Sequence, residues 1–403
     1  MEFSREEIEN LRSCFGSPLY VFDEAGFIEN YKKLEYAMRS EYNQYRIAYS
    51  FKTNYTPYIC ALVKKMGGCA EVVSGMEYAI AKRIGFSDSE ILFNGPDKGE
   101  DGIQAFLNGC TIHADSLDEL LSYCSVAERY PERSFRIGIR IHLDIAEGFI
   151  SRFGMDAKDA EAAVKIVSNV RNLKLSGLHC HISRCRSLEA WRMRTEKMLA
   201  LADRLFDSLP EYLDFGSGMF GSMAPELAEQ FSEVPSYEDY AQVTASLLAD
   251  HYRDGCGPVL FTEPGTTLIN RFIDCISEVR SIKTIDRHYF AVLDASEHNL
   301  GETCLLKNLP IQVVSGGGEQ REYEQLPLTG YTCLEQDVLY PSYSGRLAKG
   351  DYVIFGNTGG YSNVLKPPFI RPNCAMVARK TDGSYVLIKK SESYHDLLGT
   401  YVF

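Results

Sequence analysis

Three residues in separate segments of the sequence carry side chains that could do chemistry together. Lys52 ends the strand-like run RIAYSFK, His181 lies in HCHIS, and Glu263 precedes a Pro-Gly pair. An amine in an apolar setting has a lowered pKa and can act as a Schiff-base nucleophile. An imidazole can stack on a flat ring, and a carboxylate can pair with a ring nitrogen. The same residues could instead be an exposed loop lysine, a core histidine and a helix-capping acid.

A glycine pattern adds a possible phosphate site. The segment DFGSGMFG places Gly216, Gly218 and Gly221 in the GxGxxG spacing, in which backbone N–H groups can approach a phosphate. A dinucleotide fingerprint follows the first strand of its unit, with an acid about 20 residues later. Here the pattern follows the seventh strand-like run, and Glu238 and Asp239 fall in a segment typical of a helix start. We therefore expect a monophosphate site rather than an NAD site.

All these residues fall where strand-like runs end. Short β-rich runs alternate with segments of helical composition, such as 56–67 and 187–209. This alternation predicts a parallel (β/α)8 barrel, whose active sites form at the carboxyl ends of its strands. The eight expected strands span residues 46–51, 69–74, 90–94, 110–115, 135–142, 175–183, 211–218 and 258–265.

The sequence pattern changes after residue 265. Alternating strands and turns follow, with SGGGEQ (315–320) as an expected hairpin loop, and the early run PLYVFD (18–23) could join them. The fold class expected is α/β, with an N-terminal barrel and a C-terminal antiparallel β-barrel domain. The expected boundaries are 24–265 for the barrel domain and 266–403 together with 1–23 for the β domain.

Composition excludes several functions. The 403 residues carry a formal net charge of −13, which repels nucleic-acid backbones and anionic membranes. No run approaches 18 apolar residues, and the charged N-terminus is unlike a signal peptide. Twelve scattered cysteines without a CxxC pair fit a reducing cytoplasm. Without HExxH or zinc spacing we expect no metal site, no nucleic-acid partner and no membrane association.

Seven motifs in order along nearly the whole chain resemble those of the diaminopimelate and ornithine decarboxylases. The resemblance implies pyridoxal 5'-phosphate as cofactor, a small-molecule amino-acid substrate, and a homodimer with shared active sites. The motifs are YSFKTN, AEVVSGMEYAIAKRIGF, HCHIS, DFGSG, EPG, CLEQD (333–337) and NTGGYS (357–362).

The same resemblance implies roles for individual residues. Alanine racemases are similar in fold but place an arginine at the ring nitrogen of the cofactor. A carboxylate at that nitrogen therefore favours decarboxylation over racemisation. The resemblance implies that Lys52 is covalently linked to the cofactor, that His181 stacks on the cofactor ring, and that Glu263 pairs with the ring nitrogen. The phosphate would be bound by the backbone of Gly216, Ser217 and Gly218 and by the hydroxyl of Tyr361. Cys333 of the partner subunit would protonate the carbanion left by CO₂. Glu71 and Arg140 match charged positions near the cofactor.

Two departures from the family pattern concern the phosphate. The family reads EPGR, but Thr266 stands in place of the arginine. The family also has a small residue three positions after the stacking histidine, where this chain has Arg184. We expect Arg184 to approach the phosphate while Thr266 leaves it room. The alternatives are that Arg184 binds an anionic group of the substrate or is a surface arginine.

A third departure concerns the substrate. After the cysteine the family carries an acid that binds the distal amine of the substrate, whereas this chain has Leu334 and then Glu335. We therefore expect decarboxylation of an amino acid or a larger amino-acid conjugate, such as a siderophore or antibiotic intermediate. The alternatives are diaminopimelate decarboxylase itself, with Glu335 replacing the acid, and a non-catalytic regulator. Retention of Lys52, Glu263 and Cys333 argues against the regulator.

Overall fold

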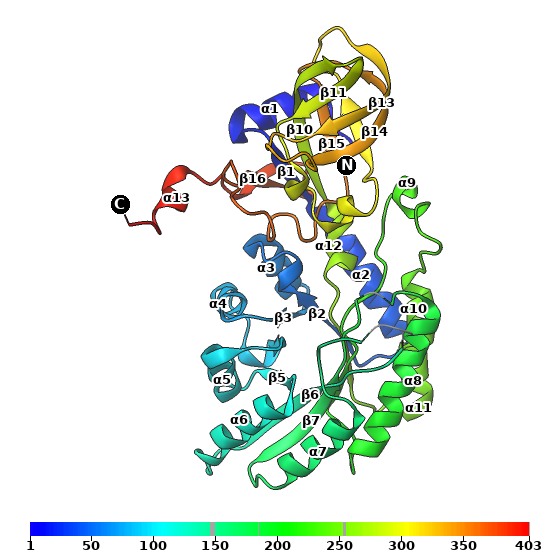
Figure 1. The fold of residues 1–403 in the computed structure, drawn as a ribbon. Helices are drawn as coiled ribbons and strands as arrows, with labels where there is room; N and C mark the ends of the chain where they lie inside the picture. Colours follow the sequence, from blue (N-terminus) through cyan, green and yellow to red (C-terminus); the bar gives the residue numbers. More distant parts are fainter. Residues whose placement is uncertain (146–149, 184, 253–254, 403) are drawn as a thin grey trace. The chain divides into compact units, whose positions relative to one another are not determined.

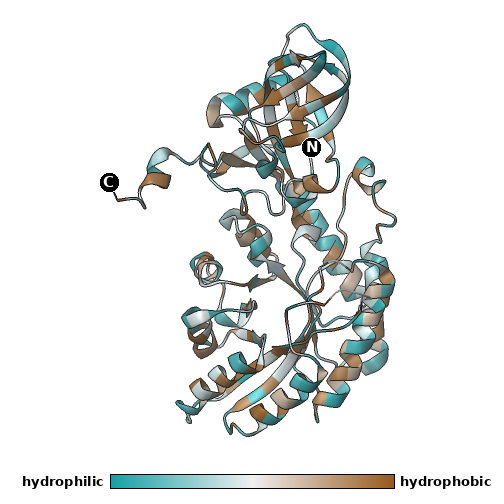
Figure 2. Cartoon of the chain, viewed as in Figure 1, coloured by the Kyte–Doolittle hydropathy of each residue, from teal (hydrophilic) through white to brown (hydrophobic). Residues whose placement is uncertain are grey.

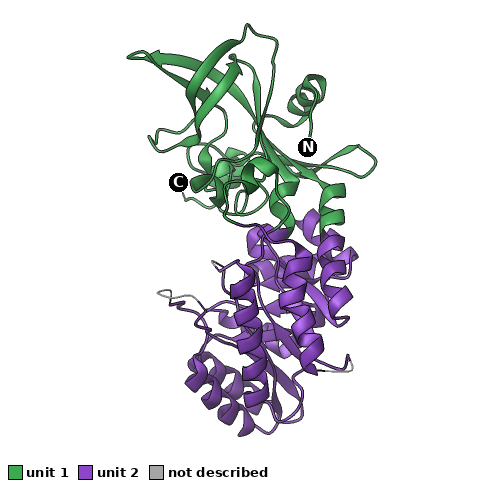
Figure 3. Ribbon diagram, turned by 90° about the vertical axis from the view of Figure 1, so that its right-hand side faces the viewer, with its two compact units in different colours: residues 1–30, 221–232, 268–403 green, residues 31–220, 233–267 purple. Residues whose placement is uncertain are grey.

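The chain forms two compact units in a computed structural model that describes residues 1–145, 150–183, 185–252 and 255–402 (Figure 1). Unit 1 comprises residues 1–30, 221–232 and 268–403, and unit 2 comprises residues 31–220 and 233–267 (Figure 3). No helix in the described part of the chain is long and apolar enough to cross a membrane.

Unit 2 is built around a closed parallel barrel. Its eight strands pair in chain order, and the last returns to the first, where Ile47 lies opposite Thr262. All eight strands predicted from the sequence are present, so the α/β fold class is confirmed. The strands are β2 (Tyr45–Ser50), β3 (Cys69–Val72), β4 (Ile91–Phe93), β5 (Thr111–Ala114), β6 (Phe135–Arg140), β7 (Leu173–His179), β8 (Tyr212–Asp214) and β9 (Val259–Thr262).

Helices surround this barrel and carry both hydrophobic and hydrophilic residues (Figure 2). Serine side chains cap several of them: Ser74, Ser116 and Ser187 each accept a bond from an N–H of the first turn. The helices and turns are α2 (Glu24–Glu41), η1 (Phe51–Thr53), α3 (Pro57–Lys65), α4 (Gly75–Ile84), η2 (Asp88–Glu90), α5 (Gly99–Asn108), α6 (Leu117–Glu128), α7 (Ala157–Ser168), α8 (Leu188–Leu205), α10 (Tyr237–Val243) and α11 (Ala245–Tyr252).

Unit 1 holds a mixed sheet of nine strands. They run in the order β14-β13-β11-β10-β1-β16-β17, and β15 pairs with both β10 and β12. The pairings are antiparallel except β1 with β16 and β11 with β13. The strands are β1 (Leu19–Asp23), β10 (Ile273–Ile285), β11 (His288–Leu293), β12 (Ile311–Val314), β13 (Arg321–Thr329), β14 (Val338–Leu347), β15 (Tyr352–Phe355), β16 (Ala375–Arg379) and β17 (Tyr385–Lys389).

The early strand β1 belongs to this sheet, as the sequence suggested, because it lies between β10 and β16. Helix α1 (Arg5–Phe15) buries Ile8 and Leu11 in the same core as Leu19. The remaining helices and turns are α9 (Pro225–Ala228), α12 (Thr266–Ile269), η3 (Asn270–Phe272), η4 (Glu297–Asn299), η5 (Glu302–Leu305) and α13 (Tyr394–Leu398), of which α12 begins in unit 2.

The segment SGGGEQ is not the hairpin loop that the sequence predicted. It joins β12 to β13, but β12 pairs with β15, whereas β13 pairs with β11 and β14. The glycines serve a close backbone approach, since a Cβ on Gly316 would lie 1.9 Å from the carbonyl oxygen of Gly350. The Gly316 N–H donates to the carboxylate of Asp351 at 2.8 Å. The segment is therefore held by a turn far along the chain.

Candidate active site at the carboxyl ends of the barrel strands

Lys52 and Glu71 form an ion pair at the ends of two neighbouring strands. Lys52 lies in the turn directly after β2, and its Nζ is 2.5 Å from Oε2 of Glu71 in β3. Ser50, opposite Glu71 in the strand register, donates to the same oxygen at 2.5 Å. The Lys52 side chain is 30% exposed and that of Glu71 is 1% exposed. Burial raises the pKa of Glu71, while the lysine charge opposes that shift. The amine is thus held at the barrel mouth by a buried acid.

Asn94, which follows β4, connects this pair to Glu263. Its Nδ2 donates to Oε1 of Glu71 at 3.2 Å and to Oε1 of Glu263 at 2.5 Å. Its Oδ1 lies 2.5 Å from Nδ1 of His113 in β5. Because an amide oxygen only accepts, the Nδ1 of His113 carries the proton. No sequence motif singles out Asn94, since a single amide at a strand end is a common feature.

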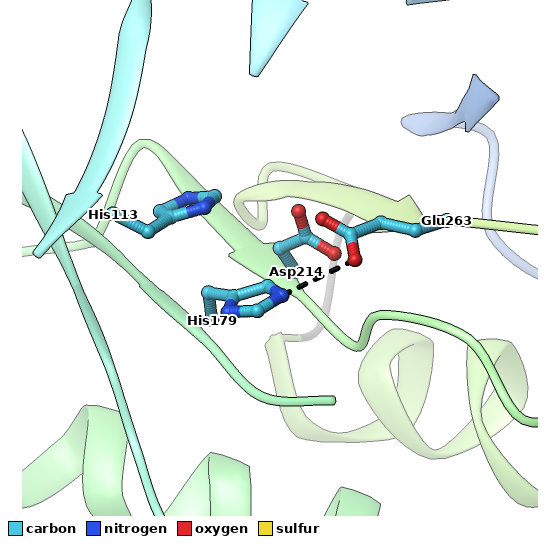
Figure 4. A group of neighbouring side chains, drawn as sticks. All are labelled: His113, His179, Asp214 and Glu263. Carbon is cyan, nitrogen blue, oxygen red and sulfur yellow. Dashed lines mark hydrogen bonds and ion pairs between the residues drawn. The ribbon is translucent and has the colours of Figure 1, made fainter. Parts of the chain in front are cut away.

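Two buried histidines pack beside Glu263 (Figure 4). Nε2 of His179 lies 3.2 Å from Oε2 of Glu263. The rings of His113 and His179 stack with centroids 4.7 Å apart and planes 8° from parallel. Burial holds the pKa of both rings well below the usual value, so both are neutral. A neutral His179 donates from Nε2 to the carboxylate.

Asp214 is the second carboxyl group of this cluster. It ends β8, is fully buried, and accepts a hydrogen bond from the N–H of Gly216 at 2.9 Å. Burial, and then the neighbouring charge of Glu263, raise the pKa of Asp214 well above its usual value. Asp214 therefore keeps its proton at neutral pH, as expected when two carboxyl groups share one site.

The cluster was not foreseen from sequence motifs, because its members come from four different strands. One nitrogen or oxygen atom of each of His113, His179, Asp214 and Glu263 lies within 4.8 Å of the others, a spacing that could hold a metal ion. Both oxygens of Glu263 already accept hydrogen bonds, and the raised pKa of Asp214 favours its protonated form. We interpret the cluster as support for Glu263, and the expectation of no metal stays a prediction.

The glycine segment packs tightly against the chain that leaves β7. Gly216 and Gly218 have φ values of +62° and +105°, and a Cβ on either would lie 2.4 Å from a backbone carbonyl oxygen, that of Cys180 or of Ile182. Both positions therefore require glycine. The N–H of Ser217 donates to Nδ1 of His181 at 3.0 Å. Burial lowers the pKa of His181 well below the usual value, in keeping with an unprotonated Nδ1.

A buried arginine of α8 binds backbone carbonyl oxygens of this segment. Arg194 donates from Nη1 to the carbonyl oxygens of Phe215 at 3.0 Å and Ser217 at 2.8 Å, and from Nη2 to that of Ile182 at 2.9 Å. The sequence motifs did not point to Arg194, because it lies in a helix between them. The available signal was an arginine on the helix face that also carries Trp191.

Other expected residues have the following surroundings. Arg140, at the end of β6, forms a 3.5 Å ion pair with Asp115, and its guanidinium lies 4.7 Å from the ring centre of Phe153. Thr266 begins α12 and is half-buried. Arg184 lies outside the described residues.

The family model described as "Pyridoxal-dependent decarboxylase, pyridoxal binding domain" matches residues 29–270, more than half of the chain. The chain belongs to this family. It is an enzyme, a pyridoxal-phosphate-dependent amino-acid decarboxylase, as the resemblance implied. The alternative of a non-catalytic regulator is therefore not supported.

Relatives of this decarboxylase match over almost their full length. Diaminopimelate decarboxylase of Aquifex aeolicus is 26% identical, covering 96% of this chain and 92% of the relative. L-glutamyl-[BtrI acyl-carrier protein] decarboxylase of Niallia circulans is also 26% identical, covering 99% and 97%. The crystal structure of diaminopimelate decarboxylase from M. jannaschii in complex with L-lysine has the same fold, with a TM-score of 0.88, 23% identity, and 98% and 94% of the two chains covered.

The barrel residues of the decarboxylase fit pyridoxal phosphate. A partly exposed amine, a buried carboxylate and a glycine segment all lie at the carboxyl ends of the strands, and the N–H groups of Gly218 and Met219 have no partner among the described residues. These are the groups needed to bind an aldehyde, a pyridine nitrogen and a phosphate. Lys52, Glu263 and the segment 215–219 would hold the cofactor.

The expected residues of the β domain lie in unit 1. Cys333, Leu334 and Glu335 occupy the connection between β13 and β14, where Cys333 and Glu335 are exposed and Leu334 is half-buried. Asp337 holds this connection: its carboxylate accepts from Oγ1 of Thr332 at 2.6 Å and from the N–H of Glu297 at 2.8 Å. Tyr361 is half-buried and has a φ of +58°.

Proposed function

We propose that this decarboxylase removes the α-carboxylate from the amino-acid end of a larger conjugate rather than from diaminopimelate. The observation that carries the proposal is Leu334, a half-buried apolar side chain where the family places an acid for the distal amine. A desolvated ammonium group beside leucine would cost several kcal/mol, about a factor of 10 in binding for each 1.4 kcal/mol. A conjugate whose distal amine is acylated avoids that cost.

The relative from Niallia circulans supports this substrate class, since its name describes a glutamyl group attached to an acyl-carrier protein. The second candidate substrate is diaminopimelate. It is favoured by Glu335, an exposed carboxylate one position after Leu334 that could replace the missing acid.

The chemistry rests on the cofactor and on what the chain does around it. Pyridoxal phosphate, when bound, withdraws electrons from the Cα atom and so stabilises the charge left by CO₂. Lys52 would hold the cofactor, and Glu71 would bind the lysine amine whenever that amine is free. Asn94 and His179 orient Glu263 toward the ring nitrogen. Glu263 would pair with the ring nitrogen of the bound cofactor, as a carboxylate at that place favours the protonated ring.

His181 would lie against the ring, and the segment of Gly216, Ser217 and Gly218 would hold the phosphate. The N–H groups of Gly216 and Ser217 already donate to Asp214 and His181, so the N–H groups of Gly218 and Met219 are the better phosphate donors. We keep Tyr361, Thr266 and Arg140 as proposed neighbours of the cofactor. Arg184 is proposed at the phosphate or, alternatively, at an anionic group of the substrate.

We further propose a cytoplasmic homodimer in which Cys333 of the partner subunit donates the proton to Cα. An exposed thiol on a connection held by Asp337 is suited to such a role. The proposed functional domains are 24–265 for cofactor binding and 266–403 with 1–23 for the β domain.

Substrate choice is tested by measuring CO₂ release from meso-diaminopimelate, ornithine, lysine, glutamate, and glutamyl or lysyl conjugates acylated away from the α-carbon. We expect kcat/KM for an acylated conjugate to exceed that for every free diamino acid. A higher kcat/KM for meso-diaminopimelate than for all conjugates overturns the proposal in favour of the second candidate.

A further inference from the structure

Among the described residues, no acid neutralises the buried guanidinium of Arg194. Its residue is fully buried, and no carboxylate in the described part of the chain lies within ion-pairing distance. The groups that favour its charged form are the neighbouring Cys180, Cys185 and Tyr240, whereas burial lowers its pKa. Its Nε has no hydrogen-bond partner among the described residues. Buried arginines are rarely left without an anion, because the desolvation penalty is several kcal/mol. The missing anion is therefore expected to be a ligand.

The hydrogen bonds around Arg194 indicate where that anion binds. Arg194 and its helix neighbour Trp191 bind the carbonyl oxygens of Ser217 and Gly218, at 2.8 Å and 3.1 Å respectively. A trans peptide directs its C=O and its N–H in opposite directions. The N–H groups of Gly218 and Met219 consequently point away from α8, and neither has a hydrogen-bond partner among the residues described.

A third side chain, besides those of Arg194 and Trp191, donates a hydrogen bond to a carbonyl of the same segment. Oγ1 of the buried Thr267 donates to the carbonyl oxygen of Met219 at 2.8 Å. Successive N–H groups oriented in this way form an anion-binding concavity. The carbonyl of Ser217, which Arg194 binds, shares its peptide with the N–H of Gly218, so the charge polarises and strengthens that donor on the opposite face.

We infer that Arg194 is the fixed positive charge of the phosphate site, acting through the peptides of the segment 215–219 rather than by touching the phosphate. This inference rests on the proposed binding of the cofactor phosphate to that segment. Thr266 stands where the family carries an arginine. Arg194 supplies a positive charge from the carbonyl side of the segment, whereas the arginine of the family would contact the phosphate directly. It is a positioning residue whose effect is confined to the doubly charged end of the cofactor.

The test compares pyridoxal 5'-phosphate with pyridoxal, which lacks the phosphate. The affinity of each for the full-length apoenzyme is measured by absorbance titration. Arg194→Met keeps the length of the side chain but removes its charge and its donors. We expect this variant to bind pyridoxal 5'-phosphate tenfold to a hundredfold more weakly, while its affinity for pyridoxal changes less than about threefold. The matched control is Arg192→Met, an exposed position on the same helix that loses the same charge, and it should change neither affinity.

A second variant keeps the positive charge but changes the shape of the side chain, so it separates the effect of the charge from that of packing. Arg194→Lys should retain most of the preference for the phosphorylated cofactor, and it also serves if Arg194→Met fails to fold. Equal losses for both probes in either variant would assign Arg194 a structural role and overturn the inference, as would unchanged preference in Arg194→Met. If the unsubstituted enzyme binds pyridoxal 5'-phosphate no better than pyridoxal, the phosphate site of the proposed function itself is wrong.

Discussion

The backbone N–H of Ser217 donates to Nδ1 of His181 at 3.0 Å, so the histidine and the glycine segment are one unit. An acceptor at Nδ1 places the proton of the neutral ring on Nε2. The lowered pKa of His181, caused first by burial and then by the positive charge of Lys52, favours this neutral form. A ring that stacks on the cofactor is thus oriented by the segment that would bind the cofactor phosphate.

Substitutions of His181 can separate the effect of its hydrogen bond with Ser217 from the effect of its flat ring. His181→Phe keeps a flat ring but leaves the N–H of Ser217 without its acceptor, which costs about 1–3 kcal/mol when the group is buried. We expect cofactor affinity to fall by roughly tenfold. His181→Asn offers an acceptor without the ring and should lose ring stacking while keeping the preference for phosphorylated over unphosphorylated cofactor. Wild-type affinity in His181→Phe would show that the hydrogen bond has no role in binding.

The protonated state of Asp214 predicts a pH dependence of stability. In the folded chain the pKa of Asp214 is raised by burial and by Glu263, whereas in the unfolded chain an aspartate ionises near pH 4. Above about pH 4 the folded state therefore binds more protons than the unfolded state, and its stability falls as pH rises toward the folded pKa. The contribution is fully present only below about pH 4.

Asp214→Asn removes this contribution while keeping an oxygen for the N–H of Gly216. The difference in unfolding free energy between Asp214→Asn and the unsubstituted chain should change in favour of the variant by up to about 1.4 kcal/mol per pH unit from pH 5 to 8. Urea unfolding at each pH measures it. Buried His113 and His179 act in both proteins, so their effect cancels. A difference that stays constant with pH would mean that Asp214 is ionised in the folded chain.

The barrel and the positions of its polar strand ends could be predicted because they depend on local patterns. Lys52, His181 and Glu263 each follow a short buried run, and parallel strands in a barrel bring their carboxyl ends together. The loop SGGGEQ shows the limit of such reasoning. Its composition is that of a hairpin, but the pairing of β12 with β15 depends on residues about 40 positions away.

The support around Glu263 could not be predicted for the same reason. Asn94, His113, His179 and Asp214 are ordinary residues in their own segments, and they gain a role only when four strands place them side by side. Arg194 differs, because an arginine on the apolar face of its helix conflicts with a simple packing role. That conflict is visible in the sequence, whereas the three carbonyl oxygens that it binds are not.

Leu334 predicts a change in substrate preference. Leu334→Glu restores an acid after the cysteine and should raise kcat/KM for meso-diaminopimelate relative to an acylated conjugate by about tenfold or more. The matched variant is Glu335→Gln, which removes the neighbouring exposed charge. If Glu335→Gln abolishes turnover of meso-diaminopimelate while Leu334→Glu leaves the ratio unchanged, Glu335 is the specificity residue and Leu334 is not.

Subunit mixing tests whether active sites are shared. Lys52→Ala cannot attach the cofactor, and Cys333→Ala lacks the proposed proton donor, so each homodimer should be inactive or nearly so. In a mixed dimer one site receives both substitutions and the other receives neither. Random exchange in a symmetric dimer then restores up to about a quarter of the wild-type activity. The measurement is CO₂ release before and after exchange, with exchange itself verified by affinity tags on the two variants.

The mixing experiment also has an internal control in the double variant. Lys52→Ala with Cys333→Ala in one chain, mixed with unsubstituted chains, leaves no intact site in a mixed dimer if sites are shared, but one intact site if each is built within a single chain. Activity should therefore fall by about half on exchange with an equal amount of double variant. Activity that stays constant on exchange, together with no recovery in the first mixture, would place Cys333 and Lys52 of one chain in the same site.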